Sequence, residues 1–295
     1  MSALIPPLPT GPADPSGAAP GFDPRRTLRL RTECARQFGR RGTLVLLIVM
    51  LVLPLAMAAA MKAGRSDMVF EGDVLGRLAT DSAENFTMVC LFVGAQLFLV
   101  VVVAYLFGDA LTRESSWGYL RVLATVPVPR TRLLLIKAAA LSVLVTAGVL
   151  VYAVASYLIG LVFFGPGPLS PVAGEGVTGA AGLGRLAIMV AFILVYLTWI
   201  AALALLLSTV SHDNTAVAIT GTVMITIGFH VLGGLGMLGR LRAVLPSRNY
   251  AAWLDAARVE FDPTNMLWGV FLSLLYATAL TAAAVVAINV REIRR

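Results

Sequence analysis

Six long apolar stretches without a charged residue constrain this chain more than any other feature. They are residues 42–61, 88–107, 138–164, 186–211, 214–239 and 265–290, and each is 20 to 27 residues long. About 20 apolar residues at a helical rise of about 1.5 Å cross a hydrocarbon core of about 30 Å. A backbone in lipid must satisfy its own hydrogen bonds, and barrel strands would be only about 10 residues long. The pattern therefore predicts an all-α integral membrane protein with six transmembrane helices.

The distribution of charge predicts the orientation of these helices. Only 13% of the 295 residues are charged, against about 25% in a soluble domain. With six spans, 15 of the 23 Lys and Arg residues and 7 of the 16 Asp and Glu residues lie on the side of the two termini. That side has a net charge of +8 and the other side −1, so both termini are predicted to be cytoplasmic. We expect a multi-pass protein of a cell membrane, such as a bacterial inner membrane, whose basic face meets anionic lipid or a cytosolic partner, with no nucleic acid.

The chain before the first span divides into two parts. Residues 1–24 are rich in Pro, Gly and Ala and are predicted to be a disordered cytosolic tail, and 42–295 form the transmembrane domain. Between them, 25–41 form a basic amphipathic pattern with Glu33 in the same polar strip as Arg25, Arg29, Arg36 and Arg40. This pattern favours an interfacial helix on the cytosolic leaflet over an irregular solvated arm.

The predicted external loops differ in character. The 165–184 connection is rich in Gly and Pro and is expected to be a flexible link. The glycines of 233–239 should weaken the end of the fifth helix. In 245–261, Ser247 can cap a short helix on which Tyr250 and Leu254 share a face beside Trp253, so we expect a half-buried external helix that dips into the bilayer.

No catalytic motif is recognisable. Residues 174–179 and 234–239 match G-x-G-x-x-G, but neither follows a strand or opens a helix in a βαβ unit, and the sequence contains no Walker A motif. Cys34 and Cys90 have no metal-ligand spacing. Within the spans, Gln96 either holds helices together or contacts a substrate, and His230 is expected near the outer interface. These two residues are the candidates for a translocation path, and an intramembrane hydrolase is disfavoured.

The loop between the second and third spans is unusually apolar. Residues 114–126 predict a short helix with a narrow polar strip, which Pro127 and Pro129 end. Such a helix either lies on the membrane or inserts into a groove of a soluble partner, and its helix-spaced aromatic and arginine anchors favour the groove.

This loop resembles the first cytosolic loop of the permease subunits of export-type (ABC-2 type) ABC transporters. The positions that carry the resemblance are Glu114, Gly118, Leu120, Leu123, Pro127, Arg130 and Lys137. The basic helix before the first span is similar to that family's elbow helix, and Leu245-Pro246, Trp253 and Asp255 are similar to its pattern before the last span. One departure is Ser116-Trp117 directly before the glycine, which bears on which ATPase fits.

The resemblance implies a function without chemistry in this chain. The chain would bind no cofactor, and ATP and Mg would sit on a dimer of separate ABC ATPase subunits. Two permeases, either two copies or a copy with a homologue, would dock their 114–126 helices on that dimer. Trp117, Leu120 and Leu123 would supply the grip, while Glu114, Arg121 and Arg130 would set the register. The alternatives are an ion-coupled secondary transporter or channel and, within the exporter class, the maturation or supply of an extracytoplasmic protein.

Overall fold

The protein is a bundle of long helices. The structure, a computed structural model, describes residues 30–64, 73–116, 130–170, 176–211, 214–258 and 260–293. In chain order the elements are α1 (Leu30–Phe38), α2 (Arg41–Lys62), α3 (Asp73–Asp81), α4 (Ala83–Val93), the π-helical turn η3 (Gly94–Phe98), α5 (Leu99–Ser116), α7 (Arg130–Phe163), α8 (Gly179–Val210), α9 (Thr215–Gly234), the 3₁₀ segments η4 (Gly236–Val244), η5 (Pro246–Asn249) and η6 (Ala252–Ala257), and α10 (Thr264–Ile293). In these ranges the extended pairing is a single bridge between Leu169 and Val177.

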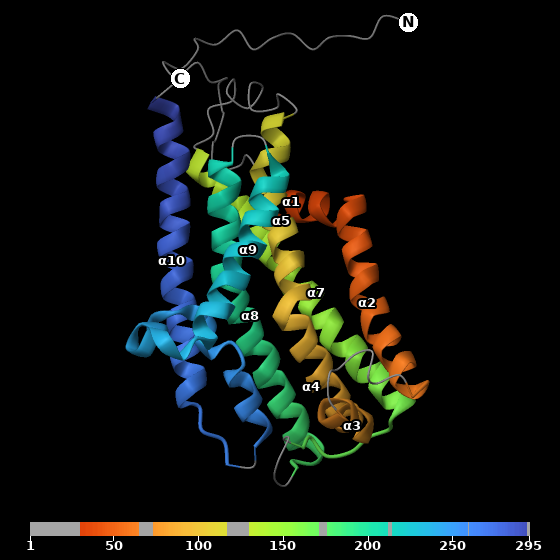
Figure 1. The fold of residues 1–295 in the computed structure, drawn as a ribbon. Helices are drawn as coiled ribbons and strands as arrows, with labels where there is room; N and C mark the ends of the chain where they lie inside the picture. The colour runs from red at the N-terminus through yellow and green to blue at the C-terminus, as the bar shows by residue number, and fades with distance from the viewer. Residues whose placement is uncertain are drawn as a thin grey trace, which may run out of the picture.

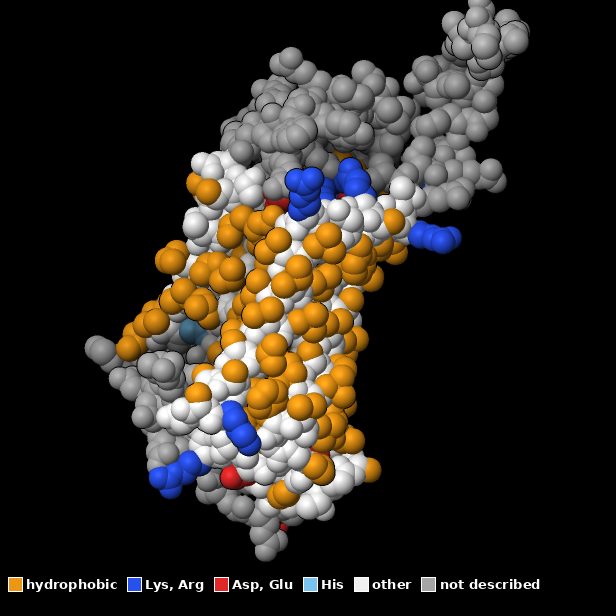
Figure 2. All heavy atoms as spheres, turned by 90° about the vertical axis from the view of Figure 1, so that its right-hand side faces the viewer, with side chains coloured by type: hydrophobic (Ala, Val, Ile, Leu, Met, Phe, Trp, Pro, Cys, Tyr) orange, Lys and Arg blue, Asp and Glu red, His pale blue; other side chains and the backbone are white. Residues whose placement is uncertain are grey.

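Six helical segments of the described chain are long and apolar enough to cross a membrane. They are Arg41–Lys62, Ala83–Ala110, Thr131–Phe163, Gly179–Val210, Thr215–Gly234 and Thr264–Val290. The prediction of an all-helical, multi-pass membrane protein is therefore confirmed. Figure 2 shows apolar side chains over the middle of one face and Lys and Arg side chains near its two ends, the distribution expected across a bilayer.

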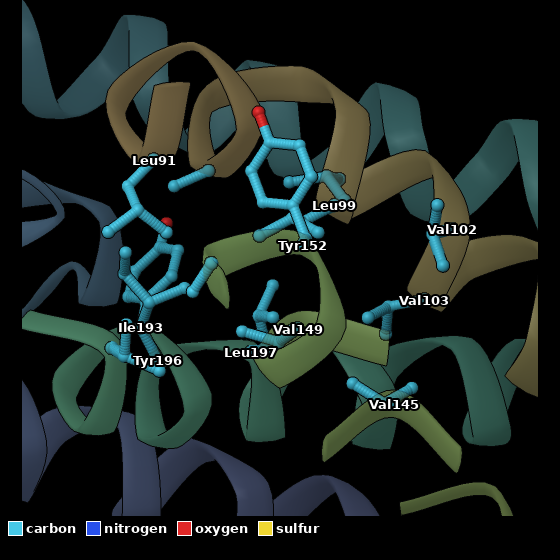
Figure 3. Close-up of a cluster of buried hydrophobic side chains, with 14 of the residues drawn as sticks. Leu91, Leu99, Val102, Val103, Val145, Val149, Tyr152, Ile193, Tyr196 and Leu197 are labelled. Carbon is cyan, nitrogen blue, oxygen red and sulfur yellow. The ribbon is translucent and has the colours of Figure 1, made fainter. Parts of the chain in front are cut away.

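The second and fourth spans form the centre of the bundle. α8 packs against α5, α9 and α10, α4 packs against α7, and α7 packs against α2. Figure 3 shows the side chains of α4, α5, α7 and α8 that meet there, among them Leu91, Val145 and Ile193. Because lipid is as apolar as these side chains, close packing holds such helices together, and small residues allow it. Gly160 illustrates this, since a Cβ there would lie 2.9 Å from the Cα of Ala83.

One end of the bundle gathers the elements that matter for the site. α1 lies crosswise at this end, between α5 and the start of α2 (Figure 1), and it packs mainly against α7. The helices extend beyond the uncharged stretches, because α7 begins at Arg130 and α4 at Ala83. Lys137, expected at the entrance of the third span, therefore lies two turns inside α7.

At the opposite end, a set of hydrogen bonds, which we call the clasp, fixes the start of the connection between α7 and α8 where a flexible link was expected. Ser82 caps α4 by accepting from the amide of Asn85 (3.1 Å), and its hydroxyl donates to the carbonyl of Pro168 (2.9 Å). The amide of Gly167 donates to Glu84 (3.1 Å), and that of Ser170 donates to Asn85 (2.8 Å). These bonds satisfy polar groups at the start of a buried helix, so residues 165–170 are fixed over α4. The expectation of a plain link is wrong for this stretch.

The chain between α9 and α10 departs from an α-helix. α9 ends at Gly234, as the glycine-rich sequence suggested, and Gly239 has a φ of 49° that favours glycine. Residues 246–257 then form two 3₁₀ segments in place of the expected α-helical turn. Ser247 does not cap them, and its hydroxyl donates to the carbonyl of Phe229 on α9. Trp253 is 1% exposed, so the 246–257 segment is packed inside the bundle.

Candidate functional site

The segment expected to dock an ATPase is flanked by α5 and α7. Glu114 lies in the last turn of α5 and Arg130 is the first residue of α7, and their side chains are outside the described part of the structure. The other docking candidates on the loop also lie outside the described residues: Trp117, Gly118, Leu120, Arg121, Leu123 and Pro127. Arg25 and Arg29 are outside it too. Lys137, Arg36 and Arg40 are described, and each lies in an ion pair with Glu33 or Asp109.

Lys137 is buried, with 1% of its surface exposed. Its ammonium donates to the carbonyl of Ala110 on α5 (Nζ–O 3.3 Å) and lies 4.0 Å from Oε1 of Glu33 on α1. A buried ammonium is costly unless it is paired and hydrogen-bonded. Lys137 therefore faces inward and connects three helices, and it does not present its charge on an outer docking surface.

Glu33 is the acidic partner at the centre of this arrangement. It is 5% exposed and accepts hydrogen bonds from Nε2 of Gln37 and Nη2 of Arg36, both at 2.8 Å. Burial acts to raise the pKa of Glu33, but Arg36, Lys137 and Gln37 outweigh it and hold that pKa below its usual value. The sequence pattern places Glu33 in one polar strip with the arginines, and Glu33 does bond Arg36; the structure adds that Glu33 and Gln37 are buried against the bundle.

A second ion pair joins α5 to the residue before α2. Nη1 of Arg40 lies 3.6 Å from Oδ2 of Asp109, which is 5% exposed. We call Glu33, Gln37, Arg40, Asp109 and Lys137 the basal charge cluster. The cluster joins α1 and Arg40 to α5 and α7, the helices that flank residues 117–129 in the chain. Since separation would strand buried charges, these helices are held together as one unit.

The second span contains a π-helical turn, and a close contact explains its position. The hydroxyl of Tyr152 on α7 donates to the carbonyl of Cys90 at 2.7 Å, and its ring lies against Gly94. A Cβ on Gly94 would lie 2.9 Å from the Tyr152 ring, so glycine permits this approach. The helix is wider in this turn, because the amide of Leu99 donates to the carbonyl of Gly94, five residues earlier. π-helical turns of this kind often occur at functional sites.

Gln96 and His230 are brought close by this turn and the 246–257 segment. Nε2 of Gln96 donates to the hydroxyl of Tyr250 at 3.4 Å, and the Tyr250 and His230 rings meet edge to face at 4.8 Å. The Tyr196 hydroxyl on α8 lies 3.1 Å from Nε2 of His230, and Nδ1 lies 2.8 Å from the carbonyl of Thr226. That carbonyl can only accept, so Nδ1 carries a proton, and a neutral His230 accepts from Tyr196 at Nε2.

This arrangement, which we call the π-turn network, offers uncharged donors and acceptors at membrane depth. Gln96 is exposed, and His230 and Tyr250 are partly exposed, so the network reaches the surface of the bundle. It can hold a polar but uncharged group by hydrogen bonds. Sequence reasoning missed Tyr196, because nothing in an apolar helix marks one tyrosine as a partner of a histidine. Tyr250 was noted as part of a helix face, but its proximity to Gln96 depends on the fold of the 246–257 segment.

A family model described as "Protein of unknown function (DUF2705)" matches residues 45–294, which include most of the first span and all of the other five. No curated protein matches the sequence.

Proposed function

The chain belongs to the DUF2705 family, and we propose that it is the membrane-spanning permease subunit of an ATP-binding cassette exporter. The observation that carries the proposal is the basal charge cluster, which joins α1 to α5 and α7, the two helices that the loop resembling an ATPase-docking helix connects in the chain. A partner that pushes or pulls on residues 117–129 would act on this joined unit.

The proposed mechanism requires a docking contact that transmits movement from the ATPase to the permease. ATP-driven closure of the ATPase pair does work on the permease only if the contact persists in both states and their energies differ. The buried charges supply the stiffness, because moving α5 away from α1 would separate Asp109 from Arg40 and Lys137 from the carbonyl of Ala110 inside the bundle. Two permeases, identical or homologous, would then change their spacing and open a path between them. ATP and Mg would remain on the ATPase, and this chain would bind neither.

The proposed orientation places the basal charge cluster in the cytoplasm, with both termini on the same side. The basic excess of the terminal side and the place of α1 at the end of the bundle where α2 begins support it. The 236–262 region would then be external. Cysteines at 120 and at 258 should be labelled from opposite sides of the membrane, since Arg258 is exposed. Labelling of both from one side would refute the topology.

The π-turn network is the proposed contact for the substrate. Gln96, Tyr250 and His230 present hydrogen-bonding groups and no fixed charge, which suits an amphiphile such as a hydrophobic drug, a peptide or a lipid. Supply or maturation of an external protein by the same machinery is the other role within this class.

The decisive test is recovery of the ATPase with the tagged chain from native membranes. We expect an ABC ATPase in the purified complex, its loss in Leu120→Asp and Trp117→Ala, and its retention in Leu235→Asp. Leu235 is a matched control because it is an exposed leucine at the opposite end. The docking assignment fails if both loop variants recover the ATPase at the level of the unaltered chain.

A secondary transporter or channel is the second candidate, and the π-turn network favours it. Such proteins use interrupted helices near the bilayer centre, and here η3 interrupts the second span while α9 gives way to 3₁₀ turns. The chain purified alone and reconstituted in vesicles would then carry an ion flux without ATP. Flux that requires the ATPase and ATP would exclude this candidate.

A further inference from the structure

A pocket lies at the external end of α10, away from both clusters described above. Its volume is about 420 Å³, and it is lined by Arg248, Asn249, Thr264, Asn265, Leu267 and Trp268. These residues come from η5 and from the first turns of α10, at the opposite end of the bundle from α1 (Figure 1). Neither the proposed docking loop nor the π-turn network uses them.

The polar half of the pocket carries one uncompensated positive charge. Arg248 is exposed, and no carboxylate of the described residues lies within ion-pair distance of it. Nδ2 of Asn249 donates to the carbonyl of Asn265 at 3.1 Å, which fixes that amide beside the guanidinium. The nearby Asp262 is committed to α10, because it accepts from the amide and the hydroxyl of Thr264. Hydrogen bonds from Thr264 hold the pKa of Asp262 below its usual value.

The other half of the pocket is apolar and opens toward the lipid-facing side of α10. Leu267 is 63% exposed, Trp268 47% and Phe271 53%. The Trp268 indole donates to the carbonyl of Ala243 at 3.2 Å and stacks on Phe271 at 5.4 Å, so the ring is held in place. Leu274 and Leu275 continue this exposed row one turn further along the helix. A tryptophan fixed at the end of a span marks the headgroup region of a bilayer.

We propose that this pocket binds a phospholipid with an anionic headgroup. The phosphate would lie against the Arg248 guanidinium, within reach of the Asn249 amide, and one acyl chain would follow Leu267, Trp268 and Phe271. The occupant is a lipid because the cationic half opens directly onto an exposed apolar row, which a soluble anion would leave bare. The headgroup is anionic because the lining contains a guanidinium and no carboxylate that could pair with a choline or ethanolamine.

Trp268 makes the proposal measurable in the intact protein. Of the four tryptophans, Trp199 and Trp253 are buried, and the experiment removes the third with Trp117→Phe. Quenching by brominated lipid then reports on Trp268. The protein is reconstituted in phosphatidylcholine vesicles with a minority of phosphatidylglycerol that carries brominated chains. We expect quenching above random mixing, equivalent to a preference of about fivefold, the factor typical of one basic residue at a membrane surface. Arg248→Gln should reduce the preference to about one.

Two further variants keep the outcome interpretable. Arg258→Gln removes an exposed arginine that pairs with Asp255 at 3.5 Å, and it should leave the preference unchanged. Arg248→Lys keeps the charge and should keep most of the preference even if Arg248→Gln fails to fold. Random mixing in the unaltered protein, equal losses in the two Gln variants, or loss in Arg248→Lys would each overturn the proposal. None of these outcomes depends on an ATPase, so the permease assignment is tested separately.

Discussion

Glu33→Gln is the sharpest test of the basal charge cluster. The substitution keeps the size of the side chain and its ability to accept a hydrogen bond, and it removes the negative charge that faces Lys137. Lys137 stays buried in α7, where its ammonium still donates to the carbonyl of Ala110. The perturbation therefore removes the carboxylate that α1 places beside this ammonium and should weaken the docking of α1.

The geometry sets the size of the effect. Two unit charges 4.0 Å apart interact by about 4 kcal/mol at an effective dielectric constant of about 20. Removing one partner of a buried pair typically costs about 3 to 5 kcal/mol. The pair of Glu33 with Arg36 contributes little to this sum, because the Arg36 side chain is 43% exposed. We expect α1 to undock more readily by about 3 kcal/mol, which is about a hundredfold in the opening equilibrium.

Tryptic cleavage within α1 measures this opening, because a protease cuts a helix only when it unfolds locally. Cleavage at Arg36 should become about a hundredfold faster in Glu33→Gln, and Glu260→Gln, which alters an exposed carboxylate at the other end, should change nothing. The double variant Glu33→Gln with Lys137→Met should recover much of the loss, because the buried ammonium that Glu33 faces is then absent too. A single variant that cleaves at the rate of the unaltered protein would refute the buried pair.

Three further outcomes follow from the same contacts. Gly160→Ala should lower the unfolding temperature in detergent, because its Cβ meets the backbone of Ala83 at 2.9 Å and overpacking costs about 1 to 3 kcal/mol; Gly228→Ala, with open space around it, should not. Tyr152→Phe removes the bond to the carbonyl of Cys90, one turn before η3, and should cost about 1 kcal/mol in the same assay. The pKa of Glu33 is depressed, so the stabilisation from its charge is present above about pH 4.5 and is lost as pH falls through the folded value. Amide hydrogen exchange in α1, corrected for intrinsic rates, should therefore accelerate at low pH in the unaltered protein and not in Glu33→Gln.

The long-range architecture was predictable because lipid leaves few choices. An uncharged stretch of 20 residues must be a helix, and six such stretches specify the six spans. The glycines after residue 232 also gave the end of α9 correctly. These features depend on composition within one segment, so no knowledge of the neighbouring helices was needed.

The site contacts were less predictable because they join segments far apart in the chain. A helical wheel places Glu33 among arginines, and only the position of α7 shows that this carboxylate meets Lys137. The clasp over α4 is similar, since Ser82 and Asn85 bind backbone groups of 165–170 that look like a featureless linker. Periodicity cannot reveal a π-helical turn, because Gly94 requires it only once the ring of Tyr152 lies against that glycine.

The basal charge cluster and the π-turn network both include residues of the second span, which links the proposed docking segment to the proposed substrate contact. Asp109 and Ala110 hold the basal end of α5 through buried charges, while Gln96 lies in the π-helical turn of the same span. A helix bends most easily where its hydrogen-bond ladder is interrupted. Movement imposed on the rigid basal end would therefore be absorbed at η3, where it changes the distance between Gln96 and Tyr250. If the span moved as a straight rod instead, the clasp at Ser82 would have to break, and its buried polar groups make that the costlier path.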